Sequence, residues 1–330
     1  MSNTGQTCLL LFAFIAGSIL AGCDVEEVAE IFDEIKNEQN DEWQGHTNST
    51  TNSSNSLDAN TITIASFNIK VFGQSKLKKS EVMDVLARVV RNFDMVAIQE
   101  IRSRKNDVIP RFVELINSSG RQYDFVVGER LGRTSSKEQY AYVFDTSRIA
   151  FISNSAYTVP DSGDRLHREP MVASFRAQGQ QTGQAFSFTL VNIHTDPDEA
   201  GQEVDALDDA FLFVREQNPF QDDVILLGDL NVDADRLGEL GQLPNITWTV
   251  PATTPTNTLK TESYDNILFD QSATTEFTGR SGVLDLESFF GLTREEALRV
   301  SDHLPVWAEF SAVEGGTVPQ IATRPDSIER

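Results

Sequence analysis

Polar side chains recur where short, strand-like apolar segments of the sequence end. An ionised side chain without a partner is costly to bury, so the ends of buried strands have little reason to carry one. A single Asp at a strand end is usually a turn residue. Eight such residues, which include two of the four histidines, instead indicate a hydrolytic metal site: Asn68, Glu100, His194, Asp229, Asn231, Asp265, Asp302 and His303. A set of oxygen donors with few histidines favours Mg²⁺, Mn²⁺ or Ca²⁺ over zinc.

Two stretches of sequence with the same plan must position these residues. In the first, a β-rich segment at 61–69 is followed by an apolar helical stripe and by a buried segment that ends at Glu100. In the second, a strand at 185–193 is followed by a helix across 201–217 and by a buried strand at 223–231. We therefore expect two related βαβ halves. Their strands would end in a common cleft, where α/β proteins usually bind ligands.

The composition excludes several classes of protein. The 330-residue chain is 39% hydrophobic and 23% charged, which is normal for a globular protein and excludes a fibrous or wholly disordered one. Its net charge of −23 argues against a protein that holds nucleic acid by bulk positive charge. An enzyme that meets phosphate through bound cations and a few Arg and Lys remains open. The two cysteines, Cys8 and Cys23, lie near the N-terminus and leave no Cys-based zinc site.

Residues 1–22 have the pattern of an export signal. The apolar segment at 9–21 is too short for a membrane span and has the length of a secretory hydrophobic region. It ends in Leu-Ala-Gly before Cys23, which resembles the lipobox of bacterial lipoproteins, although no Lys or Arg precedes it. That resemblance implies cleavage before Cys23 and lipid on its thiol. Residues 23–60 are expected to form an acidic tether and flexible linker, and residues 312–330 a disordered tail.

The domain at 61–311 carries an ordered series of motifs. In chain order they are SFNIKVFG, AIQEIR, LGRTSSKEQYAYVF, REPMV, VNIHTDP, LLGDLNVD, YDNILF and SDHLPV. Any one of these motifs is weak evidence, but the whole series resembles the endonuclease/exonuclease/phosphatase superfamily, and specifically its deoxyribonuclease I-like branch. The resemblance implies an α/β fold, a four-layer α/β/β/α sandwich of two packed mixed sheets. The site would lie across the top of the two sheets.

The same resemblance implies which residues bind the cation and the phosphate. Glu100 would bind the catalytic Mg²⁺ or Mn²⁺, with Asp302 and Asn68 close by. Asn68 and Asn231 would contact the phosphate or its transition state. Arg168 would also contact phosphate, for which the forked donors of a guanidinium are suited.

The resemblance further implies two carboxylate–imidazole pairs for proton transfer. Glu138 would pair with His194, and Asp265 with His303. A carboxylate favours the charged form of a neighbouring imidazole and so raises its pKa, which prepares the pair for proton transfer near neutral pH. Asp229 would help to orient the attacking water. The remaining histidine of the domain, His167, has no role in the family.

DNA contacts and a second ion are also implied. Lys70 and Arg102 match a basic phosphate contact and a side chain that enters the minor groove. A rim of further basic residues would add local positive potential, although a merely solvated charged rim is an equal alternative: Lys76, Lys78, Lys79, Arg104 and Lys105. Asp161, Asp164 and Glu169 resemble the acids of a structural Ca²⁺ site.

The expected function is a metal-dependent endodeoxyribonuclease that hydrolyses DNA to 5′-phosphate ends. We expect a monomer, anchored through acylated Cys23 on the extracytoplasmic side of a bacterial cell envelope. Two alternatives remain open. One is a phosphodiesterase on another substrate, such as RNA or a sphingomyelin-like lipid, and the other is a catalytically inactive surface-binding module on the same scaffold.

Overall fold

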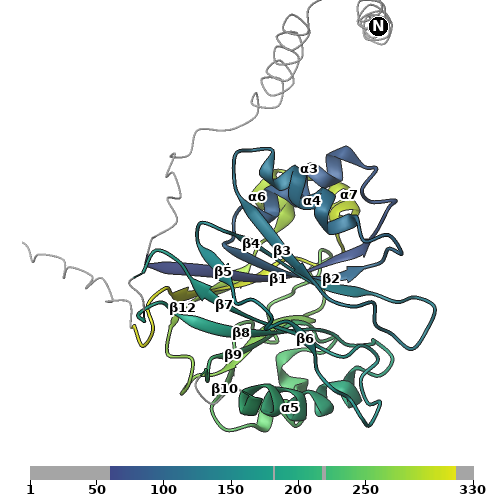
Figure 1. Cartoon of the computed structure of the whole chain (residues 1–330). Helices are drawn as coiled ribbons and strands as arrows, with labels where there is room; N and C mark the ends of the chain where they lie inside the picture. The colour runs from purple at the N-terminus through teal and green to yellow at the C-terminus, as the bar shows by residue number, and fades with distance from the viewer. Residues whose placement is uncertain (1–59, 181–182, 218–220, 317–330) are drawn as a thin grey trace, which may run out of the picture. The chain divides into compact units, whose positions relative to one another are not determined.

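The alternating strand and helix segments form two β-sheets with helices on their outer faces (Figure 1). The computed structural model describes residues 60–316, apart from 181–182 and 218–220. The predicted signal peptide and almost all of the predicted linker therefore lie outside the described residues. In the part of the chain that is described, no helix combines the length and apolarity needed to cross a membrane.

The first sheet has six strands in the order β12-β13-β1-β2-β4-β3. Strands β1 and β2 pair in parallel and the other neighbours pair antiparallel. The strands are β1 (Thr61–Phe72), β2 (Met95–Ile101), β3 (Tyr123–Val127), β4 (Gln139–Asp145), β12 (Phe277–Val283) and β13 (Val306–Ser311).

The second sheet has seven strands, six of them in the order β10-β11-β9-β8-β7-β5, with β6 paired to β7. Here β8 and β9 are the parallel pair, so each sheet is mixed. The strands are β5 (Ile149–Phe151), β6 (Tyr157–Thr158), β7 (Met171–Ala177), β8 (Ser187–His194), β9 (Val224–Asp229), β10 (Ile246–Trp248) and β11 (Asp265–Asp270).

Helices cover the outer face of each sheet, which completes the four predicted layers (Figure 1). The helices on the first sheet are α3 (Ser80–Val90), α4 (Val108–Asn117), α6 (Leu286–Phe290) and α7 (Arg294–Val300). Helix α5 (Ala200–Gln217) lies on the second sheet. The described residues also form the 3-10 turns η2 (Ala234–Arg236) and η3 (Leu240–Gln242). The prediction of an α/β/β/α sandwich is confirmed.

Burial on both faces explains why the central strands are apolar almost throughout. Along β1, Ile62 and Ile64 enter the core between the sheets, whereas Phe67 and Ile69 pack beneath the helices. The core between the sheets is rich in aromatic rings, and Phe175 contacts several of them edge-on or stacked. This packing holds the two sheets, and therefore the ends of their strands, in one arrangement.

The two predicted βαβ halves are present. Helix α3 connects β1 to β2, and α5 connects β8 to β9, each joining the two strands of a parallel pair. Helix α3 begins at Ser80, and Lys79 before it makes no side-chain capping bond.

The folded region extends a few residues past the predicted boundary at 311. The amide of Ala312 donates to the carbonyl of Asn60 at 2.7 Å, and Val313 pairs with Ala185 in an isolated bridge. The amide of Gly315 donates to the carboxylate of Glu276. Residues 312–316 are thus tied to the domain, which corrects the predicted start of the tail, and the remainder of that tail lies outside the described residues.

Candidate active site

The ends of three neighbouring strands bring one His and two Asp into line. In the second sheet His194 of β8 is the register partner of Asp229 of β9, and Asp229 is the partner of Asp265 of β11. Strand β9 reaches this register because Gly228 has no side chain. A Cβ atom there would lie 1.9 Å from the carbonyl oxygen of Ile193.

Irregular backbone in the first sheet directs Glu100 into the same region. The pairing of β1 with β2 shifts register between Asn68 and Phe72, and both Val71 and Glu100 have positive φ, at 49° and 59°. Bulges commonly re-aim side chains next to active sites. Here the backbone amide of Val71 donates to Glu100 Oε2 at 2.9 Å, so the two irregular strands support each other.

Asn68 joins the ends of the two sheets. Its Nδ2 atom donates to Asp229 Oδ2 at 2.9 Å and lies 3.3 Å from Glu100 Oε1. Asn68 is fully buried, so these bonds form away from bulk water. The predicted residues from both halves therefore meet in one place.

Two carboxylate–imidazole pairs face the same aspartate. His194 Nδ1 lies 2.9 Å from Glu138 Oε2, and His303 Nδ1 lies 2.9 Å from Asp265 Oδ2. On the other side of each ring, Nε2 lies 3.5 Å from Asp229 Oδ2. The geometry brings together the four residues predicted for proton transfer and Asp229, and it orients both rings.

The charges of these pairs are set by their mutual contacts. Burial opposes the charge of His303, but Asp265 and Asp229 overcome it and raise its pKa to about 10. Burial likewise opposes the charge of Glu138, but the hydrogen bond and charge of His194, with Arg168 and Arg102, lower its pKa to about 2. At neutral pH His303 is therefore positive and Glu138 negative.

Arg168 holds the chain that carries His194. Its Nε atom donates to the carbonyl of His194 and one terminal nitrogen donates to the carbonyl of Thr195, both at 3.0 Å. Another terminal nitrogen lies 3.6 Å from Glu138 Oε1. Asn231 also donates to the carbonyl of Thr195, at 2.9 Å. Arg168, which was predicted to contact phosphate, bonds protein groups in this structure. Its side chain holds the backbone at His194 and Thr195 in place.

The residues predicted for the catalytic cation present oxygen atoms that suit it. Within the described part of the chain, Asn68 Oδ1 and Asp302 Oδ1 are buried without a hydrogen-bond partner, and Glu100 is largely buried. Carboxylate and amide oxygens are the donors that Mg²⁺ and Mn²⁺ prefer. Glu100, Asp302 and Asn68 therefore fit a hard divalent cation.

The two predicted DNA contacts lie against these acids. Lys70 pairs with Asp302, and Arg102 donates to Glu138 Oε1 at 2.6 Å and lies 3.2 Å from Glu100 Oε2. Both basic side chains are partly exposed at the mouth of the site. They balance part of the negative charge of its carboxylates.

Lys76, which the sequence places among the basic rim residues, is buried. Its Nζ atom donates to the carbonyl of Val300 at 2.7 Å. Burial lowers the pKa of this amine to about 8, although Asp302 and Glu100 partly oppose the shift. Lys76 is therefore a structural tie to α7, and its assignment to the rim was wrong.

The three acids predicted for Ca²⁺ are not gathered into a site. Asp161 Oδ2 accepts from the amide of Leu166 at 2.7 Å, and Asp164 Oδ1 accepts from Arg133 at 3.0 Å. Among the described residues, Asp161, Asp164 and Glu169 do not form a group whose ligand atoms lie within 4.8 Å of one another. Their geometry therefore does not support a calcium site made by these side chains, because local contacts already satisfy two of them.

Two further side chains contribute to the site without a role predicted from the sequence. Thr256 donates to Asp265 Oδ2 at 2.7 Å, and the ring of Tyr264 lies 6.0 Å from that of His303. Thr256 belongs to a Thr-rich run and Tyr264 begins the motif YDNILF, but neither position indicates its neighbour in space. Only the folded structure reveals these two contacts.

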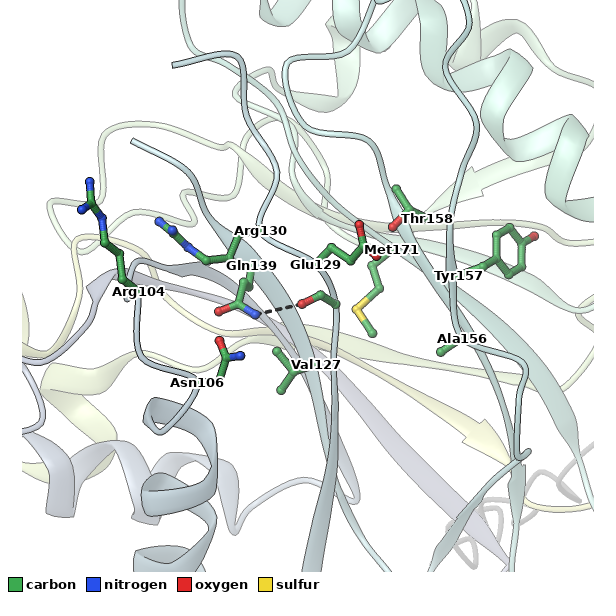
Figure 2. Close-up of a pocket in the computed structure, with 11 residues that line it drawn as sticks. Arg104, Asn106, Val127, Glu129, Arg130, Gln139, Ala156, Tyr157, Thr158 and Met171 are labelled. Carbon is green, nitrogen blue, oxygen red and sulfur yellow. Dashed lines mark hydrogen bonds between the residues drawn. The ribbon is translucent and has the colours of Figure 1, made fainter. Parts of the chain in front are cut away.

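A cavity of about 590 Å³ lies beside this site at the edge of the sheets. Figure 2 shows Arg104 and Arg130 along one side and Tyr157 along the other, with Gln139 donating to the carbonyl of Gly128. Gln139 directly follows Glu138 in β4. The cavity contains none of the predicted catalytic residues, and its charged lining residues are Arg104, Arg130 and the acid Glu129.

Known proteins share this fold and sequence pattern. The Endonuclease/Exonuclease/phosphatase family matches residues 65–303. Deoxyribonuclease gamma of Rattus norvegicus is 31% identical over 259 residues, covering 74% of this chain and 82% of the relative. Deoxyribonuclease-1 of Bos taurus is 30% identical over 260 residues, covering 74% and 90%.

Solved structures agree on the fold. An endonuclease/exonuclease/phosphatase family protein from Bacteroides thetaiotaomicron superimposes with a TM-score of 0.51 at 16% identity, covering 76% of this chain and 97% of the other. The human Nocturnin catalytic domain gives 0.53 at 15% identity, covering 77% and 95%. With the ordered motifs and the match over most of the chain, these findings establish that the protein belongs to the endonuclease/exonuclease/phosphatase family, in its deoxyribonuclease I-like branch.

Proposed function

We propose that this phosphodiester hydrolase is a divalent-metal-dependent endodeoxyribonuclease. The observation that carries the proposal is the arrangement of two imidazoles, each with its own carboxylate, on either side of Asp229. Such an arrangement can remove a proton from one reacting group and deliver a proton to another. The relatives named above are deoxyribonucleases, which favours DNA over other phosphodiesters.

In the proposed reaction, water attacks phosphorus and the bond from phosphorus to the 3′ oxygen breaks. One imidazole takes the proton of the water, while the other, charged, gives its proton to the leaving 3′ oxygen, so the product carries a 5′ phosphate. Asp229 lies close enough to both rings to hold the water between them. His303, whose pKa is raised to about 10, suits the role of proton donor.

Glu100, Asp302 and Asn68 would hold the cation at the other side of the site. A divalent cation bound there neutralises and polarises the phosphate oxygens as negative charge develops. Lys70 and Arg102 at the mouth would meet the phosphates on either side of the scissile one. Arg104 and Arg130 in the neighbouring cavity would extend this basic path, which a chain of net charge −23 needs to approach DNA.

The test is a nicking assay of the purified full-length protein on supercoiled plasmid, with single-stranded DNA, RNA and sphingomyelin in parallel. Each substrate is incubated with Mg²⁺, Mn²⁺, Mg²⁺ plus Ca²⁺, or EDTA. We expect nicked plasmid with Mg²⁺ or Mn²⁺ and none with EDTA. If the ends carry 5′ phosphate, a polynucleotide kinase labels them only after phosphatase treatment.

The same assay decides between the alternatives. Release of phosphocholine with intact plasmid would identify a lipid phosphodiesterase. Cleavage confined to RNA would identify a ribonuclease. Metal binding with no turnover on any substrate would identify an inactive binding module.

We further propose that the protein is a monomer anchored in a bacterial cell envelope through Cys23. The support is the apolar segment that ends in Leu-Ala-Gly before this cysteine. Cell fractionation after labelled-palmitate feeding should place the labelled wild-type protein in the membrane fraction. The Cys23→Ser variant should lose both label and membrane association, and equal behaviour of the two proteins would contradict the anchor. Light scattering of the detergent-solubilised protein checks the monomer.

A further inference from the structure

A second cluster of metal-type ligands lies outside the proposed active site. The loop between β6 and β7 carries His167, and the segment entering α5 carries Glu199 and Glu203. One ligand atom from each of these three residues lies within 4.8 Å of the others. Residues 36 positions apart therefore converge on one point, on the outer side of the second sheet where α5 begins.

His167 is directed into these acids without a hydrogen bond of its own. Its side chain is only 10% exposed, and within the described residues its ring nitrogens form no hydrogen bond. The carboxylate oxygen Oδ2 of Asp196 lies 3.6 Å from Nδ1 of this ring. A ring nitrogen that holds no protein hydrogen bond can bind a metal ion without first breaking one.

The two glutamates are held in place before any ion binds. Glu203 is fully buried, and its oxygens accept from the backbone amides of His167 at 3.1 Å and Asp196 at 3.3 Å. Each of these carboxylate oxygens retains a free lone pair. Glu199 lies one helical turn earlier, partly exposed, with Oε2 bonded to Arg133 at 2.8 Å. The cluster thus has a buried floor and an entrance from solvent.

We propose that His167, Glu199 and Glu203 form a binding site for a first-row divalent transition metal, with Zn²⁺ as the leading candidate. Imidazole nitrogen and carboxylate oxygen both bind zinc, and three protein ligands leave a further position for water or Asp196. The imidazole distinguishes this site from one for Mg²⁺ or Ca²⁺, which prefer oxygen donors alone. The metal is separate from the catalytic cation at Glu100.

Such a metal would secure the segment that carries a catalytic histidine. His167 adjoins Arg168, which bonds the carbonyls of His194 and Thr195. Glu203 in turn accepts from the amide of Asp196, two residues after His194. Binding would clamp the loop before β7, the end of β8 and the start of α5 together. Its main effect would be on stability, because a ligand that binds only the folded state stabilises it.

The test measures zinc stoichiometry and thermal stability of the full-length protein. Wild type and Glu100→Gln are dialysed against Zn²⁺ alone, and bound metal is counted by mass spectrometry. We expect both proteins to retain one equivalent that His167→Ala loses, with at least about 100-fold weaker zinc affinity in that variant. At saturating Zn²⁺ the melting temperature of the wild type should rise by at least about 4 °C, and that of His167→Ala should not.

Matched controls keep the result interpretable. Asp198→Asn alters an exposed acid of the same loop outside the cluster and should bind zinc as the wild type does. Glu199→Gln removes the partly exposed ligand of the cluster. It provides a second test if circular dichroism shows that His167→Ala does not fold. Equal zinc stoichiometry and melting shift in wild type and His167→Ala would overturn the proposal. A melting shift that Ca²⁺ produces and that persists in His167→Ala would also overturn the proposal. Glu199 and Glu203 would then bind the ion without the imidazole.

Discussion

At the scale of single residues, the site depends on Asp229. This buried carboxylate accepts from Asn68 and lies 3.5 Å from the outer nitrogen of both His194 and His303. The inner nitrogen of each ring faces a second carboxylate, which fixes the orientation of the ring. Arg168, which donates to the carbonyls of His194 and Thr195, helps to hold this arrangement.

Replacing either catalytic histidine should abolish most of the activity. We expect His194→Ala and His303→Ala each to lower kcat/KM for plasmid nicking by about 10²–10⁴-fold, the usual contribution of a general acid or base. The double variant should be little worse than the singles, because residues that act as a unit are not additive. Arg294→Ala, an exposed change on α7, serves as the control. Full activity in either His variant would remove that residue from the mechanism.

Arg168→Lys should separate positioning from charge. Lysine retains the positive charge but cannot donate to two carbonyls through a planar fork. We therefore expect kcat to fall about 10–100-fold, with KM nearly unchanged, since the substrate contacts of the site remain. A rise in KM with unchanged kcat would instead assign Arg168 to phosphate binding.

At the scale of elements, the two parallel strand pairs and the irregular backbone where β1 pairs with β2 position the residues of the site. Parallel strands present their carboxyl ends at one edge, so Asn68 and Glu100 meet in one sheet and His194 and Asp229 in the other. The close approach of β8 to β9 in turn depends on Gly228, whose φ is 155°.

Gly228→Ala should disturb both stability and catalysis. The added methyl group would meet the carbonyl of Ile193, and the strands would have to separate next to His194 and Asp229. We expect a loss of about 1–3 kcal/mol in the free energy of unfolding and a large fall in kcat. Gly120→Ala is the matched control, because its φ of 86° is also positive but no atom lies within 4 Å of the new Cβ. Equal effects of the two changes would show that backbone strain, and not the strand contact, is responsible.

At the scale of the whole molecule, the two sheets are joined by a shared apolar core and also by buried acids. Asp223 precedes β9 of the second sheet, and Glu276 precedes β12 of the first. Both are almost fully buried. Burial, together with the charge of Glu276, raises the pKa of Asp223 to about 8, and burial also raises the pKa of Glu276.

This acid pair should make the stability depend on pH. The pKa of Asp223 is higher in the folded protein than its ordinary value of 3.8, so the folded state binds more protons. Its contribution is fully present below about pH 4 and is lost as the pH rises through about 8. Asp223→Asn should flatten the fall in the free energy of unfolding over that range and stabilise the protein at pH 8, as measured by urea unfolding. An unchanged pH profile would contradict the assignment.

The sequence by itself determined the residue types and the elements that carry them. Apolar stripes and β-rich segments predict α3, α5 and the central strands, because local periodicity reports which face of an element is buried. The ordered motifs identify the family, and with it the partners of both histidines.

Tertiary structure alone decided which groups satisfy one another. Asn68 bonds Asp229 across 161 residues of sequence, and no local pattern reports such a contact. The same holds for Lys76, which looks like a rim lysine and is buried against Val300. The acids of the predicted calcium loop bond to neighbours in space, while His167 of that loop meets acids of α5. The physical reason is that charge and hydrogen-bond partners are chosen by distance in the folded chain, which packing of the two sheets fixes.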